Sequence, residues 1–464
     1  MLVAFYGDDF SGTSATAEAL WKTGTPTLIF TDPPSPGQLA ERFPWVRAAG
    51  VAGTARTLPV DCMESTLIPI FETMKAYGAP FFLYKACSTF DSSPTIGSIG
   101  RAIEIGRRVF SPEFVPVLPA APKLGRYTVF GHHFAALGQG EVFRLDRHPS
   151  MARHPITPMD ESDLRLHLAR QTELRSGLID LFALDKGSDY VNARIDEFVA
   201  ASIPIIVFDC LYKRHLDLTC GLLWQRATRG ESLFMVGSQE VGYGLGEAWR
   251  KAGLLPDNGM PAGGFELEDH GPILVVSGSC ATVNGAQIRW ALENGFAGVS
   301  LEAWRLLDPV GRSGELERVT EDCLAALRQG RSVIIHTAVG AADPRIREMR
   351  GRADELSVSR GVADEILGES LGELALGVVQ DFGLQRLVIA GGDTAGRIQR
   401  HLHIQALEVV RAVGIAAPLC YVYSDIRRVN GLEMAFKGGQ IGSIDYFDQA
   451  RLVRTARRKA TGAG

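Results

Sequence analysis

The chain has 464 residues, which is more than one ordinary hydrophobic core holds, so we expect two or more domains. Hydrophobic residues make up 46% and charged residues 22%, as in soluble globular proteins, and no apolar run approaches the roughly 18 residues that span a bilayer. The formal net charge of -5 provides no basic field, so we expect neither a nucleic-acid nor a membrane partner.

Short apolar runs alternate with helix-period segments through the first half of the chain. Segments such as SATAEALWKTG and ESDLRLHLARQT have the helical period. Continuous apolar runs separated by helices are typical of parallel sheets covered on both faces. The runs that we expect to form strands are residues 2–7, 25–31, 80–87, 177–184 and 203–210.

The second half of the chain has the same alternation. Its expected strands are residues 272–279, 297–303, 331–338 and 385–392. Residues 253–271 are rich in Gly, Pro and acids without any period, and we interpret them as a linker. The sequence therefore predicts an α/β protein of two domains, residues 1–252 and 272–464, each a largely parallel sheet flanked by helices, with a cleft between them.

The stretch YGDDFSGT places two adjacent carboxylates, Asp8 and Asp9, where the first strand should end. One aspartate suffices to cap the following helix, with Gly7 making the turn, and this is the simpler interpretation. A second like charge costs stability unless a cation or a substrate uses it. We therefore treat both aspartates as candidate site residues.

Lys85 ends another apolar run and precedes a hydroxyl-rich turn that contains Ser88, Asp91 and Ser92. An isolated lysine usually extends into solvent, but a lysine beside such a turn and a helix N-terminus can hold a carboxylate. Arg126, in the stretch GRYTVFG, either contributes to the same pocket or packs structurally.

Three glycine-containing loops in the second half can hold an anion. Glycines let the backbone approach phosphate closely, and hydroxyls and helix N–H groups bind phosphate oxygens. None of these loops is a G-x-x-x-x-G-K-[ST] or G-x-G-x-x-G motif, so a nucleotide would be held by a less familiar set of loops. The loops contain Ser277, Gly278 and Ser279, then Gly391, Gly392, Asp393 and Thr394, and finally FKGGQIGS at 436–443 with Lys437.

Six segments, taken in chain order, resemble the four-carbon acid sugar kinases: YGDDFSGT, YKACSTFDSSP, APKLGRYTVFG, VVSGSCATVNGAQ, VIAGGDTAG and FKGGQIG. The resemblance covers nearly the whole chain. It implies an enzyme that transfers the γ-phosphoryl group of ATP, with Mg²⁺, to a hydroxyl of a small sugar acid. The amino-terminal domain would bind the sugar acid and the carboxyl-terminal domain would bind ATP.

The resemblance also assigns residues to the two sites. One of Asp8 and Asp9 would act as the base while the other orients a hydroxyl or holds Mg²⁺, and Lys85 would hold the carboxylate of the substrate. The residues do not decide which aspartate is the base, which hydroxyl reacts or which sugar acid binds. The ATP site would be lined by Ser277, Ser279, Gly391, Gly392, Asp393 and Thr394 and closed by Gly438 and Gly439.

Three segments depart from the pattern of the threonate-type members. Those members read K-x-D-S-T-L-R-G where this chain has KACSTFDSSP, so Cys87 replaces an acid and the arginine is absent. Where those members have GGET this chain has GGDT, and where they have KPGG it has KGGQ. These changes favour an oxidised branched acid such as 3-oxo-isoapionate over threonate or erythronate.

Two other functions compete with the kinase interpretation. An NAD(P)-dependent oxidoreductase is disfavoured by the missing G-x-G-x-x-G motif, and a non-enzymatic small-molecule sensor by the acid pair. The sequence leaves the oligomeric state open, with a homodimer as one option. Cys280 lies beside a phosphate loop without a histidine partner, and we interpret it as a small buried residue.

The spacing of the cysteines and histidines does not predict a metal centre, so the sequence does not identify the ligands of any metal ion. The seven cysteines are odd in number and include no C-x-x-C pair, which favours reduced thiols in a cytoplasmic protein. The chain becomes acidic at Asp8 without a preceding basic segment, so we expect no signal peptide. Five further residues lie in irregular segments without an i, i+4 pair and give no zinc site, namely His132, His133, Asp146, His148 and His154.

Overall fold

A computed structural model describes most of the chain, which divides into two compact units, residues 1–261 and 262–464. Most of the expected linker, residues 257–267, lies outside the described residues. No helix in the described part is long and apolar enough to cross a membrane. The described residues are 1–138, 140–154, 156–230, 232–256, 268–414 and 416–455, with only the backbone described at 392–394.

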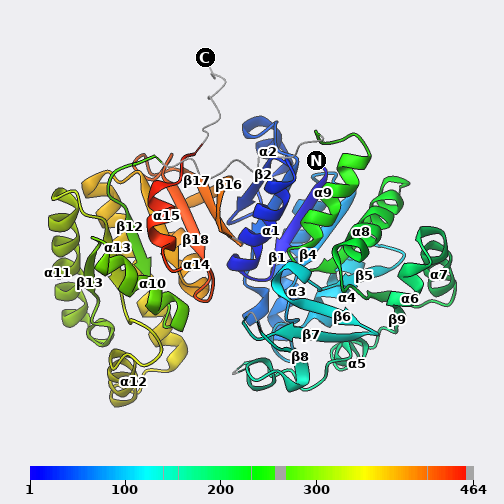
Figure 1. The fold of residues 1–464 in the computed structure, drawn as a ribbon, viewed down its shortest axis with the longest axis horizontal. Helices are drawn as coiled ribbons and strands as arrows, with labels where there is room; N and C mark the ends of the chain where they lie inside the picture. The colour runs from blue at the N-terminus through cyan, green and yellow to red at the C-terminus, as the bar shows by residue number, and fades with distance from the viewer. Residues whose placement is uncertain (139, 155, 231, 257–267, 415, 456–464) are drawn as a thin grey trace. The chain divides into compact units, whose positions relative to one another are not determined.

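The first unit is built on a parallel sheet with the strand order β2-β3-β1-β4-β11-β5-β10-β9 (Figure 1). A small antiparallel sheet, β6-β7-β8, accompanies it. The strands are β1 (Val3–Gly7), β2 (Thr27–Phe30), β3 (Ala48–Ala52), β4 (Phe81–Lys85), β5 (Val115–Leu118), β6 (Arg126–Val129), β7 (His132–Ala136), β8 (Val142–Arg144), β9 (Ser176–Ile179), β10 (Ile205–Phe208) and β11 (Leu233–Gly237).

Two groups of helices flank this sheet: α8 packs on α9 and α9 on α1, while α3 and α4 form a separate pair. The rings of Phe71, Phe82, Phe110 and Phe234 pack against one another inside the fold, in edge-on, tilted and stacked pairs, and form part of its core. The helices are α1 (Phe10–Lys22), α2 (Pro36–Arg42), α3 (Val60–Lys75), α4 (Ile99–Phe110), α5 (Leu164–Ala169), α6 (Leu181–Asp185), α7 (Ser188–Ala200), α8 (Lys213–Thr228) and α9 (Val241–Lys251).

The second unit has the strand order β13-β14-β12-β15-β18-β17-β16. The strands up to β18 are parallel, and β17 and β16 add an antiparallel edge. The strands are β12 (Leu274–Ser277), β13 (Ala297–Ser300), β14 (Val333–His336), β15 (Arg386–Ala390), β16 (Ile404–Gly414), β17 (Ala417–Ser424) and β18 (Glu433–Lys437).

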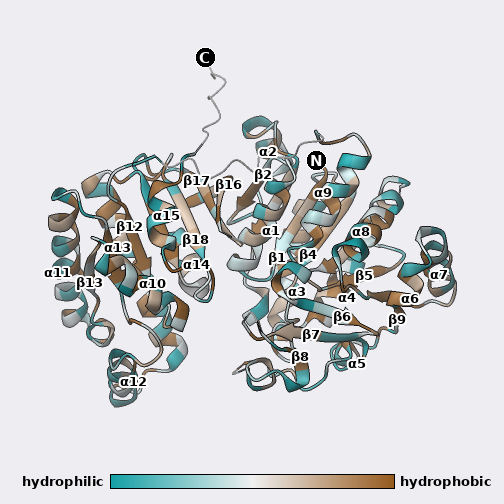
Figure 2. Ribbon diagram, in the orientation of Figure 1, coloured by the Kyte–Doolittle hydropathy of each residue, from teal (hydrophilic) through white to brown (hydrophobic). Residues whose placement is uncertain are grey.

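Helices α11, α13 and α14 pack together in this unit, and α10 packs on α15. In Figure 2 the central strands of both units are largely brown, whereas the flanking helices carry teal segments, as expected of sheets buried on both faces. The helices are α10 (Thr282–Glu293), α11 (Pro309–Arg328), α12 (Arg345–Glu355), α13 (Arg360–Phe382), α14 (Gly392–His401) and α15 (Tyr446–Leu452).

The prediction of two largely parallel α/β domains is confirmed, but several strands differ in detail. The run expected over 177–184 ends as a strand at Ile179, because Asp180 caps α6 by accepting a hydrogen bond from the backbone N–H of Ala183. β3 was not predicted, since its sequence AAGVA lacks the large β-branched residues that mark a strand. The antiparallel β16–β17 pair was also missed.

Candidate substrate and nucleotide sites

The first candidate site lies at the carboxyl ends of three neighbouring parallel strands in the first unit. β1 runs between β3 and β4, and Gly7 at its end pairs with Ala52 on one side and Lys85 on the other. Residues that follow these strands therefore meet at one edge of the sheet. They are Asp8 and Asp9 after β1, Arg56 after β3 and Lys85 at the end of β4.

The ammonium group of Lys85 lies between the two adjacent carboxylates. Its Nζ atom is 3.4 Å from Asp8 Oδ1 and 3.1 Å from Asp9 Oδ1. Arg56 contributes a second cation, with Nη1 3.0 Å from Asp9 Oδ2. Two cations therefore balance two anions, which explains how like charges can stand side by side at the end of a buried strand.

Exposure separates the members of this cluster. The side chains of Lys85 and Asp8 are only 3% and 2% exposed, whereas Asp9 is 18% and Arg56 is 28% exposed. Asp8 Oδ2 also accepts a hydrogen bond of 3.3 Å from the backbone N–H of Cys87, so both carboxylate oxygens of Asp8 are engaged inside the fold. A ligand at this edge would therefore meet Asp9 and Arg56 first.

The two aspartates differ in their pKa values because their surroundings differ. Burial raises the pKa of Asp8 to about 6, although Lys85 opposes the shift. Burial also acts on Asp9, but Lys85 and Arg56 together outweigh it and hold the pKa of Asp9 below its usual value. Asp9 is therefore firmly ionised near neutral pH, whereas Asp8 takes up a proton in mildly acidic solution.

Asp9 also caps α1, since its Oδ1 accepts a hydrogen bond of 2.9 Å from the backbone N–H of Gly12. The absence of a side chain at Gly12 is what lets Lys85 reach the pair. A Cβ atom there would lie 1.5 Å from Lys85 Nζ and 2.5 Å from Asp9 Oδ1. The start of the helix and the ionic cluster are thus built as one structure.

The turn after β4 is held largely by buried hydrogen bonds. Ser92 Oγ lies 2.8 Å from His167 Nε2 and accepts a 3.0 Å hydrogen bond from Gln171. The carbonyl oxygen of Ser88 accepts a 2.8 Å hydrogen bond from His133, whose pKa burial lowers to about 4, so that ring is neutral. These contacts hold Ser88 and Ser92 in place, and their role toward a substrate stays a prediction.

Asp91 and Arg126 each keep a buried polar atom without a hydrogen-bond partner in the described part of the chain. In Asp91 it is the carboxylate oxygen Oδ1. In Arg126 it is Nε, while Nη1 donates to backbone carbonyls including that of Ala136 at 3.3 Å. A buried carboxylate oxygen is costly to leave unpaired, so Asp91 is the stronger candidate to contact a ligand.

We expect Lys85→Met to lower the free energy of unfolding by about 3–5 kcal/mol, because it leaves two carboxylates buried with a single cation. Urea unfolding of the two proteins measures the difference. Lys213→Met is the matched control, since Lys213 forms an exposed pair with Asp217 and its loss should change stability by less than about 1 kcal/mol. Equal stability of the two variants would contradict a buried ionic cluster.

The second candidate site lies at the carboxyl ends of β12, β15 and β18, which are adjacent in the sheet of the second unit. The backbone N–H of Gly278 donates to the carbonyl of Ala390 (3.2 Å), and that of Gly391 donates to the carbonyl of Lys437 (3.1 Å). These bonds tie the three predicted phosphate loops together at the edge of the sheet.

A buried polar chain runs beneath these loops. Asn284 donates to the hydroxyl of Ser277 at 2.8 Å and to the carbonyl of Ser279 at 3.1 Å. Lys437 Nζ donates to Asn284 Oδ1 at 3.2 Å, and burial lowers the pKa of Lys437 to about 7. The hydroxyl of Ser277 is thus used inside the protein, whereas Ser279 remains half-buried at the surface.

Open backbone donors lie above this chain. Ala281 and Gly391 occupy the N-cap positions of α10 and α14, and among the described side chains none caps either helix. The first N–H groups of both helices are therefore available to an anion. A Cβ atom on Gly439 would lie 2.2 Å from Ser279 Oγ, so a glycine is needed where these two loops meet.

The remaining predicted residues of this site are placed as follows. Gly438 follows β18 and lies beside Ile441, which a Cβ atom on it would approach to 3.3 Å. Gly392, Asp393 and Thr394 begin α14, but their side chains lie outside the described part of the structure. The interpretation of Cys280 as buried is wrong, because this cysteine is exposed between β12 and α10.

Comparison with known proteins agrees with this division of the chain. Residues 3–245 match the sugar-binding N-terminal domain and residues 274–447 match the nucleotide-binding C-terminal domain of one protein family. The protein is thus a two-domain α/β protein that combines a sugar-binding domain with a nucleotide-binding domain. The chain belongs to the four-carbon acid sugar kinase family, as its six motifs predicted.

Similar proteins match almost end to end. The chain is 41% identical to a 3-oxo-isoapionate kinase of Paraburkholderia graminis, over 98% of this chain and 95% of that protein. It is 29% identical to a 3-oxo-tetronate kinase of Cupriavidus necator, over 97% and 96% of the two chains. A crystal structure of a Salmonella typhimurium LT2 protein shares the fold, with a TM-score of 0.78, 22% identity and coverage of 97% and 98%.

Sequence reasoning missed Arg56 and did not single out Asn284. Arg56 follows β3, so the rule of inspecting what comes after each strand would have found it, had AAGVA been recognised as a strand. Asn284 lies two residues inside α10, where a buried amide is not distinguishable by sequence from a solvent-facing one.

We expect the stability of the wild-type protein to rise relative to that of Lys437→Met between about pH 7 and pH 10. Because burial lowers the pKa of Lys437 in the folded state, the unfolded chain binds more protons than the folded chain across this window. The difference should grow by up to about 1 kcal/mol per pH unit, as measured by urea unfolding. A constant difference would contradict the lowered pKa.

Proposed function

We propose that this protein is an ATP-dependent kinase that phosphorylates a hydroxyl of a 3-oxo sugar acid, with 3-oxo-isoapionate as the first candidate substrate. The observation that carries the proposal is the 41% identity, along nearly the whole chain, to the 3-oxo-isoapionate kinase of P. graminis. Threonate, erythronate and 3-oxo-tetronate are the alternative substrates that an assay must compare.

In this proposal Arg56 binds the carboxylate of the sugar acid. Its guanidinium group has further donors beyond the Nη1 contact to Asp9, and it is the more exposed of the two cations. Lys85 was expected to hold that carboxylate, but its ammonium is buried and already shared by two aspartates. In this proposal Lys85 therefore positions the two aspartates, and Arg56 instead of Lys85 binds the carboxylate of the substrate.

Asp9 then accepts the proton of the reacting hydroxyl, because it is the aspartate that a substrate can reach. Asp8 acts as a positioning group that holds Lys85 and the backbone of Cys87. Burial raises the pKa of the Cys87 thiol to about 11, so this side chain is neutral near pH 7 and does not repel an anionic substrate as a carboxylate would.

The phosphates of ATP would rest on the open N–H groups of α10 and α14, with Lys437 supplying charge beneath them. Mg²⁺ would neutralise charge on the transferred phosphoryl group. This ion is usually held by substrate phosphates and one or two protein oxygens, which is compatible with the absence of any cluster of three His, Cys, Asp or Glu ligands among the residues described.

We expect Asp9→Asn to reduce kcat for 3-oxo-isoapionate by about 10²–10⁴-fold, the usual contribution of a general base. ATP affinity by calorimetry should stay unchanged, and asparagine can still cap α1. A coupled assay of ADP release measures the rate. Asp180→Asn is the matched control, because Asp180 also caps a helix of the first unit but lies outside the cluster.

The same assay on the wild-type protein tests the substrate. 3-Oxo-isoapionate should give a higher kcat/KM than 3-oxo-tetronate, threonate or erythronate, and ATP but not NAD should raise the melting temperature. Normal turnover by Asp9→Asn would show that Asp9 is not the general base. If the wild-type protein releases no ADP with any of these acids, the kinase proposal is rejected.

We expect kcat/KM to fall as the pH drops through about 6, because Asp8 then becomes protonated and loses its hold on Lys85. Above this pH the carboxylate is ionised and the cluster is complete, so no further gain is expected from this group. A pH profile of ADP release measures this acidic decline. A kcat/KM that stays unchanged down to pH 4.5 would contradict the role of Asp8.

A further inference from the structure

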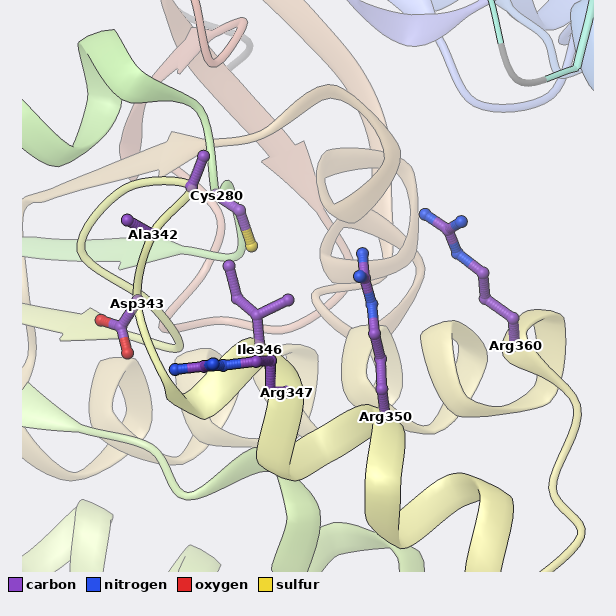
Figure 3. Close-up of a pocket in the computed structure, with 8 residues that line it drawn as sticks. Cys280, Ala342, Asp343, Ile346, Arg347, Arg350 and Arg360 are labelled. Carbon is purple, nitrogen blue, oxygen red and sulfur yellow. The ribbon is translucent and has the colours of Figure 1, made fainter.

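The second unit contains a pocket that the proposed nucleotide loops do not account for. It has a volume of about 540 Å³ and is lined by the loop between β12 and α10, the segment after β14 and helices α12 and α13 (Figure 3). The lining residues that bear on its chemistry are Cys280, Asp343, Arg347, Arg350 and Arg360.

Three arginines face this pocket with almost no acidic partner. Arg347 and Arg350 form no ion pair within the described residues, and Arg360 has only a long, exposed contact of 3.9 Å to Asp364. Arg347 and Arg350 lie three residues apart on α12, a spacing at which like charges repel. An anion bound in the pocket would offset this positive charge.

The one acid in the lining, Asp343, does not balance these charges. Its carboxylate is already bound by Arg345, through contacts of 2.9 Å to Nε and 2.6 Å to Nη2. The carboxylate also accepts a hydrogen bond of 2.7 Å from the backbone N–H of Val339. The pocket therefore carries the positive charge of three guanidinium groups, which match phosphate geometry well.

The pocket adjoins the proposed phosphate loop. Cys280 belongs to its lining and directly follows Ser279 in the chain, one residue before the N-cap of α10. Burial raises the pKa of the Cys280 thiol, the charge of Asp343 raises it further and the charge of Arg350 opposes both, so charged groups of the pocket act on this loop. In Figure 3 the side chains of Arg350 and Arg360 extend in a similar direction from their helices, whereas that of Arg347 extends toward Asp343 at the other side of the pocket.

We propose that Arg347, Arg350 and Arg360 hold the terminal phosphate of a nucleoside triphosphate whose other two phosphates rest on the open N–H groups of α10 and α14. This inference rests on the proposed kinase function and adds residues that the loops alone do not supply. It assigns the three arginines the task of distinguishing a triphosphate from a monophosphate.

The first test measures nucleotide affinity of Arg350→Met by calorimetry with ATP, ADP and AMP. We expect ATP affinity to fall about tenfold or more, as for loss of a charge-assisted hydrogen bond, with a smaller loss for ADP and none for AMP. Arg352→Met is the matched control, because Arg352 lies on the same helix but is paired with Glu355 at 2.9 Å. Unchanged ATP affinity, or equal losses for all three nucleotides, would overturn the inference while leaving the kinase proposal intact.

The second test follows alkylation of Cys280 in a Cys62→Ser background, because Cys62 is the other exposed cysteine of the described chain. ATP or inorganic tripolyphosphate should slow the reaction, and Arg350→Met should abolish that protection. If the wild-type protein binds no nucleotide, the proposed function fails. Protection by tripolyphosphate would then still support a polyphosphate site at these arginines, and lack of protection would overturn it.

Discussion

The buried ammonium of Lys85, shared between Asp8 and Asp9, is the contact on which the site of the first unit depends. It arises because β1 and β4 are adjacent, parallel and in register, so that the last residue of one strand stands beside the residues that follow the other. Without this cation, the buried carboxylate of Asp8 would stand beside the partly exposed carboxylate of Asp9 with no positive charge between them. With it, Asp9 and Arg56 are held at the surface as an oriented, ionised pair.

The second unit uses the same edge of a parallel sheet for a different purpose. Its loops offer backbone N–H groups rather than carboxylates, and a neutral amide, Asn284, joins Ser277, Ser279 and Lys437 beneath them. A lysine whose pKa lies near 7 can gain its charge when an anion arrives, whereas a permanently charged group would have to be paired beforehand. The first unit thus gathers carboxylates and cations at this edge, and the second gathers backbone N–H groups, a hydroxyl and a lysine.

The strand and helix alternation was enough to predict the fold class and to place Asp8, Asp9 and Lys85 at one edge, because apolar runs and the residues after them are local features. Arg56 could not be found in the same way, since the strand before it is made of alanine and glycine. The pairing of Asn284 with Lys437 joins residues 153 positions apart, and the exposure of Cys280 depends on tertiary packing. Such features follow from the folded structure, not from local pattern.

The lack of a side chain at Gly12 limits how the sequence of this site can change during evolution. Arg56 is the most exposed member of the ionic cluster and forms its ion pair with Asp9, so a change there leaves the contacts of Lys85 in place. At Gly12 even a methyl group would displace the ammonium of Lys85 and crowd Asp9 Oδ1, so a change there disturbs both contacts at once. The rim of the cluster can therefore vary in descendants of this chain more freely than its centre, where Gly12, Lys85 and Asp9 constrain one another.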